Sequence, residues 1–221
     1  MSSVTTEPLD VDRARSRFSA LHREVNGHPA RFFDGAGGSQ VPDSVIDAIS
    51  GYLRHSNANQ GGAFLTSGET DHIIDAAHSA AADLVGAHSG EIAFGANMTT
   101  LNFLLTHAFG RTLSVGDEIV VTQLDHEGNV SPWRLLAEDL GLTVRTVAIR
   151  ADDGALQLDE LDDLLSPRTG VVAFPLASNA LGTVPDAGRI IDAAHRAGAL
   201  AWADAVHAAP HLALDFHGLD L

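Results

Sequence analysis

The chain has 221 residues, 45% of them hydrophobic, which is enough to bury the core of one domain or most of a larger one. Its 29 Asp and Glu residues outnumber 13 Lys and Arg residues, and the resulting net charge of −16 argues against nucleic acid or an anionic membrane surface as a partner. There is no cysteine, which excludes disulfides and thiolate chemistry within these residues, and every basic residue is an arginine.

The N-terminal residues lack the apolar core of a signal peptide, and no apolar run is long enough to span a bilayer. We therefore expect a cytoplasmic protein with no membrane partner. The acidic residues are scattered along the chain, which is typical of a solvated surface.

Helical patterns and apolar runs alternate along the sequence. The elements expected in its first part are a helix over 11–25, a strand over 31–34, a helix over 42–55, a Gly- and Asn-rich loop over 56–68 and a helix over 69–87. Strands are then expected over 91–95, 117–123, 143–149, 170–178 and 199–204, alternating with helices over 98–110, 130–141, 158–165 and 187–198.

This alternation predicts an α/β fold with a mostly parallel sheet and helices on both faces. No stretch has the composition of a linker, so one compact unit is expected. Within it, residues 1–30 form an N-terminal helical segment at the side of a larger domain over residues 31–221.

Polar segments follow four of the predicted strands. They read "GANMTT", "QLDHEGN", "SNALGT" and "DAVHAAPH". Ligands of parallel α/β sheets bind outside the carboxyl ends of the strands, so we expect these segments to converge on one binding site.

Three of these segments carry residue types suited to a ligand, although each also has an ordinary structural explanation. Asn97, Met98 and Thr99 begin a helix, where backbone N–H groups and a hydroxyl can hold a phosphate or simply form an N-cap. The His126 ring can stack on a planar cofactor or shuttle protons, or else be a solvated capping residue. The Asn179 amide can contact a ligand oxygen or only its own loop.

Asp204 closes the last apolar strand and is followed by His207 and His211. A carboxylate and two imidazoles are possible metal ligands, but Pro210 argues against a helix that would place both histidines on one face. A buried Asp paired with a cationic ring nitrogen explains the position better. Together with a phosphate holder, an aromatic ring and an amide, this acid describes a site for pyridoxal 5′-phosphate (PLP), and no metal is expected there.

The sequence resembles the class V aminotransferases of PLP fold type I, and within them the cysteine desulfurase-like branch, whose relatives include selenocysteine lyases, isopenicillin N epimerase and kynureninase. Four motifs carry the resemblance in the family's order and spacing. They are "FFDGAGGSQVP" (32–42), "DEIVVTQLDHEGNVSPW" (117–133), "SNALGTVPD" (178–186) and "WADAVHAAPH" (202–211).

The resemblance implies a role for each candidate residue. His126 would stack on the pyridine ring and Asp204 would bind its nitrogen, which makes these two the expected catalytic residues. Asn179 and His207 would contact the phenolic oxygen, and Met98 and Thr99, next to Asn97, would hold the phosphate. The implied enzyme acts on an amino acid and is a homodimer when complete.

The chain also departs from the family pattern. Gln60 and Gly61 replace the His-Arg pair of a loop that usually reads Asn-x-His-Arg-Gly in the desulfurases. The family's Schiff-base lysine would lie beyond the segment "LALDFHGLDL", and these residues include no lysine. We therefore expect the N-terminal part of such an enzyme, inactive alone. The alternatives are a non-catalytic binding module and a metal-dependent hydrolase that uses Asp204, His207 and His211.

Overall fold

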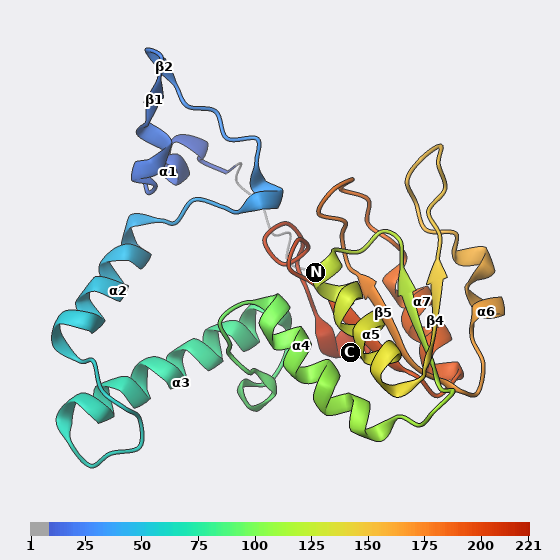
Figure 1. The fold of residues 1–221 in the computed structure, drawn as a ribbon. Helices are drawn as coiled ribbons and strands as arrows, with labels where there is room; N and C mark the ends of the chain where they lie inside the picture. The colour runs from blue at the N-terminus through green and yellow to red at the C-terminus, as the bar shows by residue number, and fades with distance from the viewer. Residues whose placement is uncertain (1–8) are drawn as a thin grey trace, which may run out of the picture. The chain divides into compact units, whose positions relative to one another are not determined.

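A computed structural model describes residues 9–221, so the part of the expected N-terminal segment that falls on residues 1–8 lies outside it. The chain forms two compact units instead of the single unit expected. The first ends at Ala76 and the second is Ala77–Leu221. The helix α3 (Leu65–Val85) runs through the boundary between them (Figure 1).

The N-terminal unit differs from the prediction in its first third. The helix expected over 11–25 is reduced to α1 (Val11–Arg15) and the 3₁₀ helix η1 (Ser19–His22), and no strand forms over 31–34. A small hairpin follows instead, in which β1 (Glu24–Val25) pairs with β2 (His28–Pro29). Its turn is Asn26-Gly27, both with positive φ, and Asn-Gly is the strongest local hairpin signal in a sequence.

The rest of this unit is helical. After the 3₁₀ helix η2 (Gly35–Gly37), α2 (Asp43–His55) begins directly after Pro42, as predicted. Helix α3 begins four residues earlier than expected, inside the predicted loop. The Ser67 hydroxyl accepts a hydrogen bond from the Gly62 N–H and donates one to the Asn59 carbonyl, which fixes the entry to this helix.

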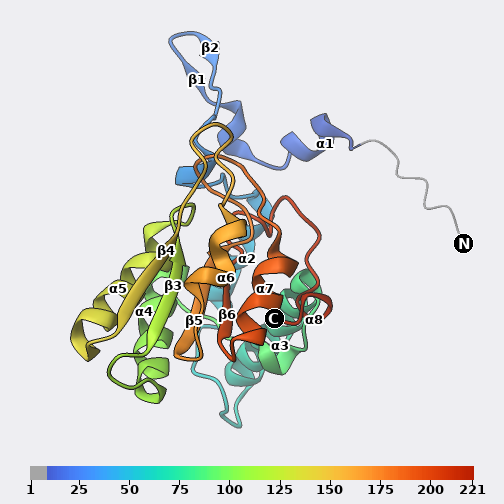
Figure 2. The same cartoon turned by 90° about the vertical axis from the view of Figure 1, so that its right-hand side faces the viewer.

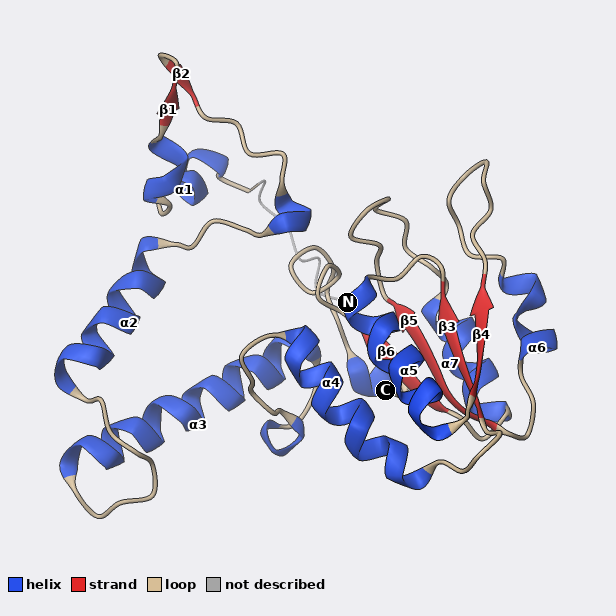
Figure 3. Ribbon diagram, viewed as in Figure 1, coloured by secondary structure: helices blue, strands red, loops and turns tan. Residues whose placement is uncertain are grey.

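The C-terminal unit is built on four parallel strands in the order β4-β3-β5-β6 (Figure 3). They are β3 (Glu118–Thr122), β4 (Thr143–Val147), β5 (Thr169–Pro175) and β6 (Leu200–Asp204). Its helices and 3₁₀ turns are η3 (Ser89–Glu91), α4 (Met98–Phe109), η4 (Gly110–Thr112), α5 (Glu127–Leu140), η5 (Leu158–Glu160), α6 (Leu161–Leu164), α7 (Ala187–Arg196) and α8 (Phe216–Leu219). The predicted α/β fold with a parallel sheet is confirmed.

Helices cover both faces of this sheet, with α4 and α5 on one side and α6 and α7 on the other (Figure 2). On the first face, Ile119 and Val121 of β3 pack with Trp133 of α5. On the second, Val120 and Phe174 belong to a core that includes Ile190 of α7. Successive β3 residues thus serve opposite cores, and all five are buried, as the apolar run predicts.

The strand expected over 91–95 does not form. Its residues run through η3 (Ser89–Glu91) and then an extended segment that makes no sheet pairing. A strand exists only with a hydrogen-bonded neighbour, and β6, the last strand of this sheet, pairs with β5 alone. The strand prediction for this segment is therefore wrong, because pairing cannot be predicted from one segment alone.

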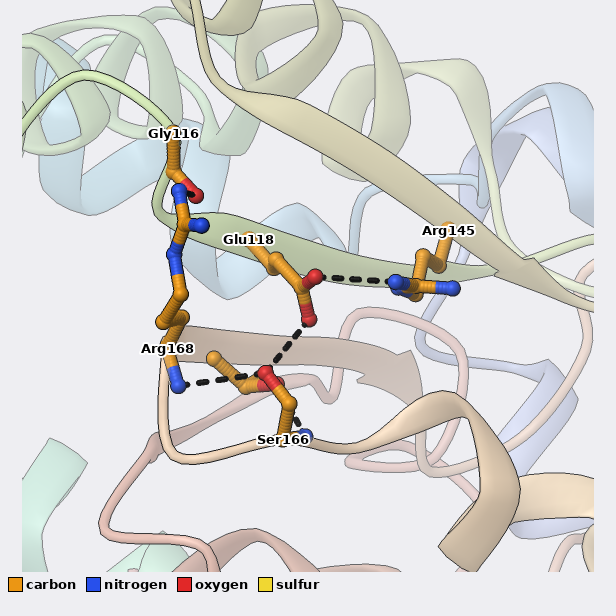
Figure 4. Close-up of polar contacts among 6 residues, drawn as sticks. Gly116, Glu118, Arg145, Ser166 and Arg168 are labelled. Carbon is orange, nitrogen blue, oxygen red and sulfur yellow. Dashed lines mark hydrogen bonds and ion pairs between the residues drawn. The ribbon is translucent and has the colours of Figure 1, made fainter.

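A buried carboxyl joins three strands at the end of the sheet opposite the predicted site (Figure 4). Glu118 accepts hydrogen bonds from Arg145 of β4 and from the Ser166 hydroxyl just before β5, both at 2.8 Å. The Arg145 contact, followed by the Ser166 hydrogen bond, holds the pKa of Glu118 below its usual value. The guanidinium of Arg168 donates to the Gly116 carbonyl nearby.

No helix within residues 9–221 combines the length and apolar character needed to cross a membrane.

Candidate functional site

The carboxyl end of β6 borders a cavity of about 370 Å³ in the C-terminal unit. Its wall includes Asn97 and Met98 at the start of α4 and Asp204 at the end of β6. These three predicted site residues come from segments about a hundred residues apart. The other lining residues are Ala93, Phe94, Gly95, Leu101, Asn102, Leu105, Asn129, Trp202 and Ala203.

The N-terminus of α4 offers hydrogen-bond donors at this cavity. Asn97 is the N-cap, and its Oδ1 accepts from the Thr100 N–H at 2.8 Å. The N–H groups of Met98 and Thr99 lie in the first helical turn and have no intrahelical acceptor. They and the helix dipole together suit an anion such as a phosphate.

His126 lies beside this helix end and is exposed. It is the N-cap of α5, and its Nδ1 accepts from the Gly128 N–H at 2.9 Å, which places the proton of the neutral ring on Nε2. A Cβ added to Gly128 would lie 2.9 Å from His126 Nδ1 and 2.9 Å from Thr99 Oγ1, with Met98 Cε at 3.2 Å. The start of α4 and the His126 imidazole therefore both contact Gly128, and this position has no room for a side chain.

Asp204 ends β6 and is partly buried. Its Oδ1 accepts from the Val206 N–H at 2.8 Å. Burial raises its pKa, while the Val206 hydrogen bond and attraction to His126 act in the opposite direction. The carboxyl and the imidazole are therefore close enough to interact, and the carboxyl gains from a cationic partner.

A second carboxyl, Asp125, was missed as a site residue by the sequence analysis. Burial raises its pKa to about 7, and repulsion from Asp204 acts in the same direction. Its Oδ1 accepts from the His126 N–H at 2.8 Å and its Oδ2 from Asn129 Nδ2 at 2.6 Å. Two acids and one imidazole thus share this end of the sheet.

Asn129 and Asn102, also missed, continue this chain of hydrogen bonds to the wall of the cavity. Asn102 Nδ2 donates to Asn129 Oδ1 at 2.9 Å and to the Gly128 carbonyl at 2.7 Å. Because both partners are acceptors, the amide orientation of Asn102 is fixed, and its buried Oδ1 has no hydrogen-bond partner among residues 9–221. The signal in the sequence was a lone Asn in the apolar run "LNFLL" and the spacing of Asp125 and Asn129 by four residues.

Two further predicted residues, Asn179 and His207, follow β5 and β6 and are not among the residues that line the cavity. Asn179 follows β5 and is partly buried. The His207 ring pairs with the His211 ring, their centroids 5.0 Å apart. Within residues 9–221, Asp204 and these two histidines do not bring three ligand atoms together, so the structure does not support the metal-dependent hydrolase.

Comparisons with known proteins show the family of the chain. The family model described as aminotransferase class-V matches residues 31–221. A cysteine desulfurase from Synechococcus elongatus is 38% identical over 215 residues, which cover 96% of this chain and 34% of the relative. A cysteine desulfurase from an Enterobacter species is 36% identical and is covered to 52%.

Solved structures give the same result. The cysteine desulfurase CsdA from Escherichia coli superposes with a TM-score of 0.81 and 25% identity, over 97% of this chain and 53% of that protein. The cysteine desulfurase from Thermococcus onnurineus NA1 has a TM-score of 0.79 and 29% identity, over 85% of this chain and 46% of that protein. The chain thus spans about a third to a half of the length of these relatives.

Proposed function

Because the chain belongs to the class-V aminotransferase family, we propose that its C-terminal unit binds PLP as part of a cysteine desulfurase-like enzyme that acts on an amino acid. The observation that carries the proposal is the cavity whose wall combines the N-terminus of α4 with Asp204. A homodimer of the complete enzyme and a cytoplasmic location stay predictions.

The residues present fit the chemical groups of PLP. A phosphate needs donors, and the free N–H groups of Met98 and Thr99 supply them. A planar ring needs a flat partner, and the exposed imidazole of His126 is beside the same helix end. A protonated ring nitrogen needs a carboxylate as its partner. Burial raises the pKa of Asp204, so its charged form gains from such a cation.

When bound, PLP supplies an electron sink for the charge that develops at the Cα of an amino acid. In this proposal Asp204 holds the proton on the ring nitrogen and His126 covers one face of the ring. The α4 N-terminus, with Asn97, Met98 and Thr99, binds the phosphate. Asn179 and His207 bind the phenolic oxygen, which requires the His207 ring to turn from His211.

These 221 residues contain no lysine, so they hold PLP without the lysine bond that the family uses, and we expect no turnover from them alone. The absence of lysine from these residues also favours a second candidate function, a binding module that carries PLP without catalysis. An assay of cysteine desulfuration with and without the downstream polypeptide of a full-length relative separates the two, because only the enzyme part gains activity by complementation.

Binding is tested by titrating the chain with PLP and recording tryptophan fluorescence. Trp202 lines the cavity. The ring centroid of the other tryptophan, Trp133, is 5.1 Å from that of Trp202. We expect saturable quenching. Asp204→Asn removes the charge that pairs with the ring nitrogen, so affinity should fall about 10- to 100-fold, as for a lost charged hydrogen bond of about 1.5–3 kcal/mol.

The matched control is Asp220→Asn, which makes the same change at an exposed carboxyl paired with His195. It should leave PLP affinity unchanged. Absence of saturable binding in the unmodified chain, or equal affinity in Asp204→Asn, would show that this cavity is not a PLP site.

A further inference from the structure

A cluster of two histidines and one glutamate lies outside the cavity, at the joint between two segments of the C-terminal unit. His88 precedes η3, Glu91 ends it, and His217 belongs to α8. One potential ligand atom from each residue lies within 4.8 Å of the other two. Glu91 and His217 are 126 positions apart in the sequence, so tertiary folding brings the three together.

The carboxylate of Glu91 is already oriented at the centre of this cluster. Its Oε2 accepts from the His88 N–H at 2.8 Å and contacts His217 Nε2 at 2.9 Å. These two hydrogen bonds fix the orientation of the carboxylate between His88 and His217. The two imidazole rings are tilted, with centroids 4.7 Å apart.

The backbone on both sides supports the cluster. Gly86 has a positive φ, and a Cβ there would lie 2.8 Å from the Cα of Asp215, so the loop that carries His88 runs directly against the start of α8. The Asp215 side chain accepts from the Gly218 N–H at 2.9 Å and caps the helical turn that carries His217. The separation of the ligands is therefore set by packed backbone.

We propose that His88, Glu91 and His217 bind a divalent transition-metal ion of the zinc class. Two imidazoles and one carboxylate form a ligand set that Zn²⁺ accepts, whereas Mg²⁺ prefers oxygen ligands alone. Ligand atoms about 2.1 Å from a tetrahedral ion are about 3.4 Å from one another. Glu91 Oε2 and His217 Nε2, which are 2.9 Å apart, would therefore separate slightly, and any pair near the 4.8 Å limit would move closer together. These shifts are free to occur, because the side chains of His217 and Glu91 are 44% and 54% exposed.

Electrostatics and access agree with this ligand set. The protein carries a net charge of −16, which attracts cations to its surface. The exposed side leaves a fourth coordination position to water. The ion displaces the proton shared by Glu91 and His217. Both side chains then coordinate the ion in place of the hydrogen bond between them.

A bound ion would tie α8 to the segment that leads into the cavity. Glu91 is followed after one residue by Ala93, Phe94 and Gly95, all of which line the cavity wall. The ion would replace the hydrogen bond between Glu91 and His217 by three metal–ligand bonds, which join residues far apart in the sequence. An ion that binds the folded chain but not the unfolded chain also stabilises the fold.

The test is calorimetric titration of the whole, tag-free chain with ZnCl₂ after chelator treatment. We expect one Zn²⁺ per chain and a rise in melting temperature at saturation. Glu91→Gln keeps an acceptor for the His88 N–H but removes the charge, and His217→Ala removes a ligand. Each should weaken Zn²⁺ binding at least tenfold, while circular dichroism reports an unchanged fold.

The control is His211→Ala, which removes another paired histidine of the same unit. It should leave the affinity for Zn²⁺ unchanged. The proposal is overturned if Zn²⁺ does not saturate at one site, if Glu91→Gln and His217→Ala bind like the parent, or if MgCl₂ binds as tightly as ZnCl₂. The result does not depend on PLP, so its failure leaves the proposed function intact.

Discussion

Asp125 is a buried acid whose protonation should control the stability of this fold. Its pKa is raised to about 7 from 3.8, mainly by burial. The folded chain therefore binds a proton between about pH 4 and pH 7 that the unfolded chain has released. Stability should fall as pH rises through this window and stay low above it, where both states are ionised.

The size of the effect follows from the two pKa values. Each pH unit between them corresponds to about 1.4 kcal/mol, so ionised Asp125 costs about 4 kcal/mol at pH 8. Asp125→Asn removes that charge. The amide keeps one acceptor for the two donors, His126 N–H and Asn129 Nδ2, so about 1–2 kcal/mol of hydrogen bonding is lost.

Asp125→Asn should therefore be more stable than the parent by about 2–3 kcal/mol at pH 8 and less stable by about 1–2 kcal/mol near pH 4. Urea unfolding followed by tryptophan fluorescence at pH 4, 6 and 8 measures this crossover. Asp139→Asn, the same change at an exposed position of α5, should keep the pH dependence of the parent. If Asp125→Asn shows the parental pH dependence, or is the less stable protein at every pH, Asp125 is not a destabilising buried charge.

Two further substitutions test the sheet and the site. Glu118→Gln should lower the free energy of unfolding by about 1–2 kcal/mol at pH 7, because the charged bond to Arg145 is lost. The pKa of Glu118 is lowered, so this difference should shrink as pH falls through that lowered pKa and the parent becomes protonated. A difference that persists unchanged at pH 2.5 in urea melts would contradict this. Gly128→Ala should weaken PLP binding at least tenfold by displacing the His126 ring, whereas Gly51→Ala, whose added methyl meets open space, should not. Equal PLP affinity in both variants would refute the close packing at Gly128.

The central strands and helices were predictable because each one is specified by its own residues. The run "EIVVT" is buried at every position in β3, and its apolar centre, Ile119 to Val121, is typical of a strand that is covered on both faces. In α7 the apolar residues Ile190, Ile191 and Ala194 fall on one face, and these are the residues that the sheet buries. Local pattern and tertiary environment agree for these elements.

The N-terminal elements were mispredicted because two local signals competed. The apolar spacing over 11–25 favoured a helix, but the Asn26-Gly27 turn adopts positive φ at both positions and folds the chain back into a hairpin. Phe18 has extended backbone angles, which separates α1 from η1. The turn chemistry was visible in the sequence and should have outweighed the spacing.

The site was predictable as far as a residue's position at the end of a strand determines its environment. Asp204 borders the cavity because it closes β6, at the sheet edge where ligands of parallel sheets bind. Met98 reaches the same cavity from the start of α4, although the segment before it forms no strand. The hydrogen bonds around Asp125 were not predictable, because Asn129, which donates to this carboxyl, itself accepts from Asn102 of another helix. Whether a carboxyl near a strand end is solvated or enclosed is decided by such distant amides.

The unpaired segment over 91–95 also shows that local sequence does not determine tertiary contacts. It contains an apolar run and Ile92 has extended backbone angles, yet sheet pairing is a property of two segments. Ala93, Phe94 and Gly95 instead face the cavity beside Trp202 and Asp204. The backbone groups of this segment and the free edge of β6 thus lie next to the proposed PLP site. Any chain that completes the sheet there would also complete the wall of the cavity, so PLP affinity should rise when that edge is paired.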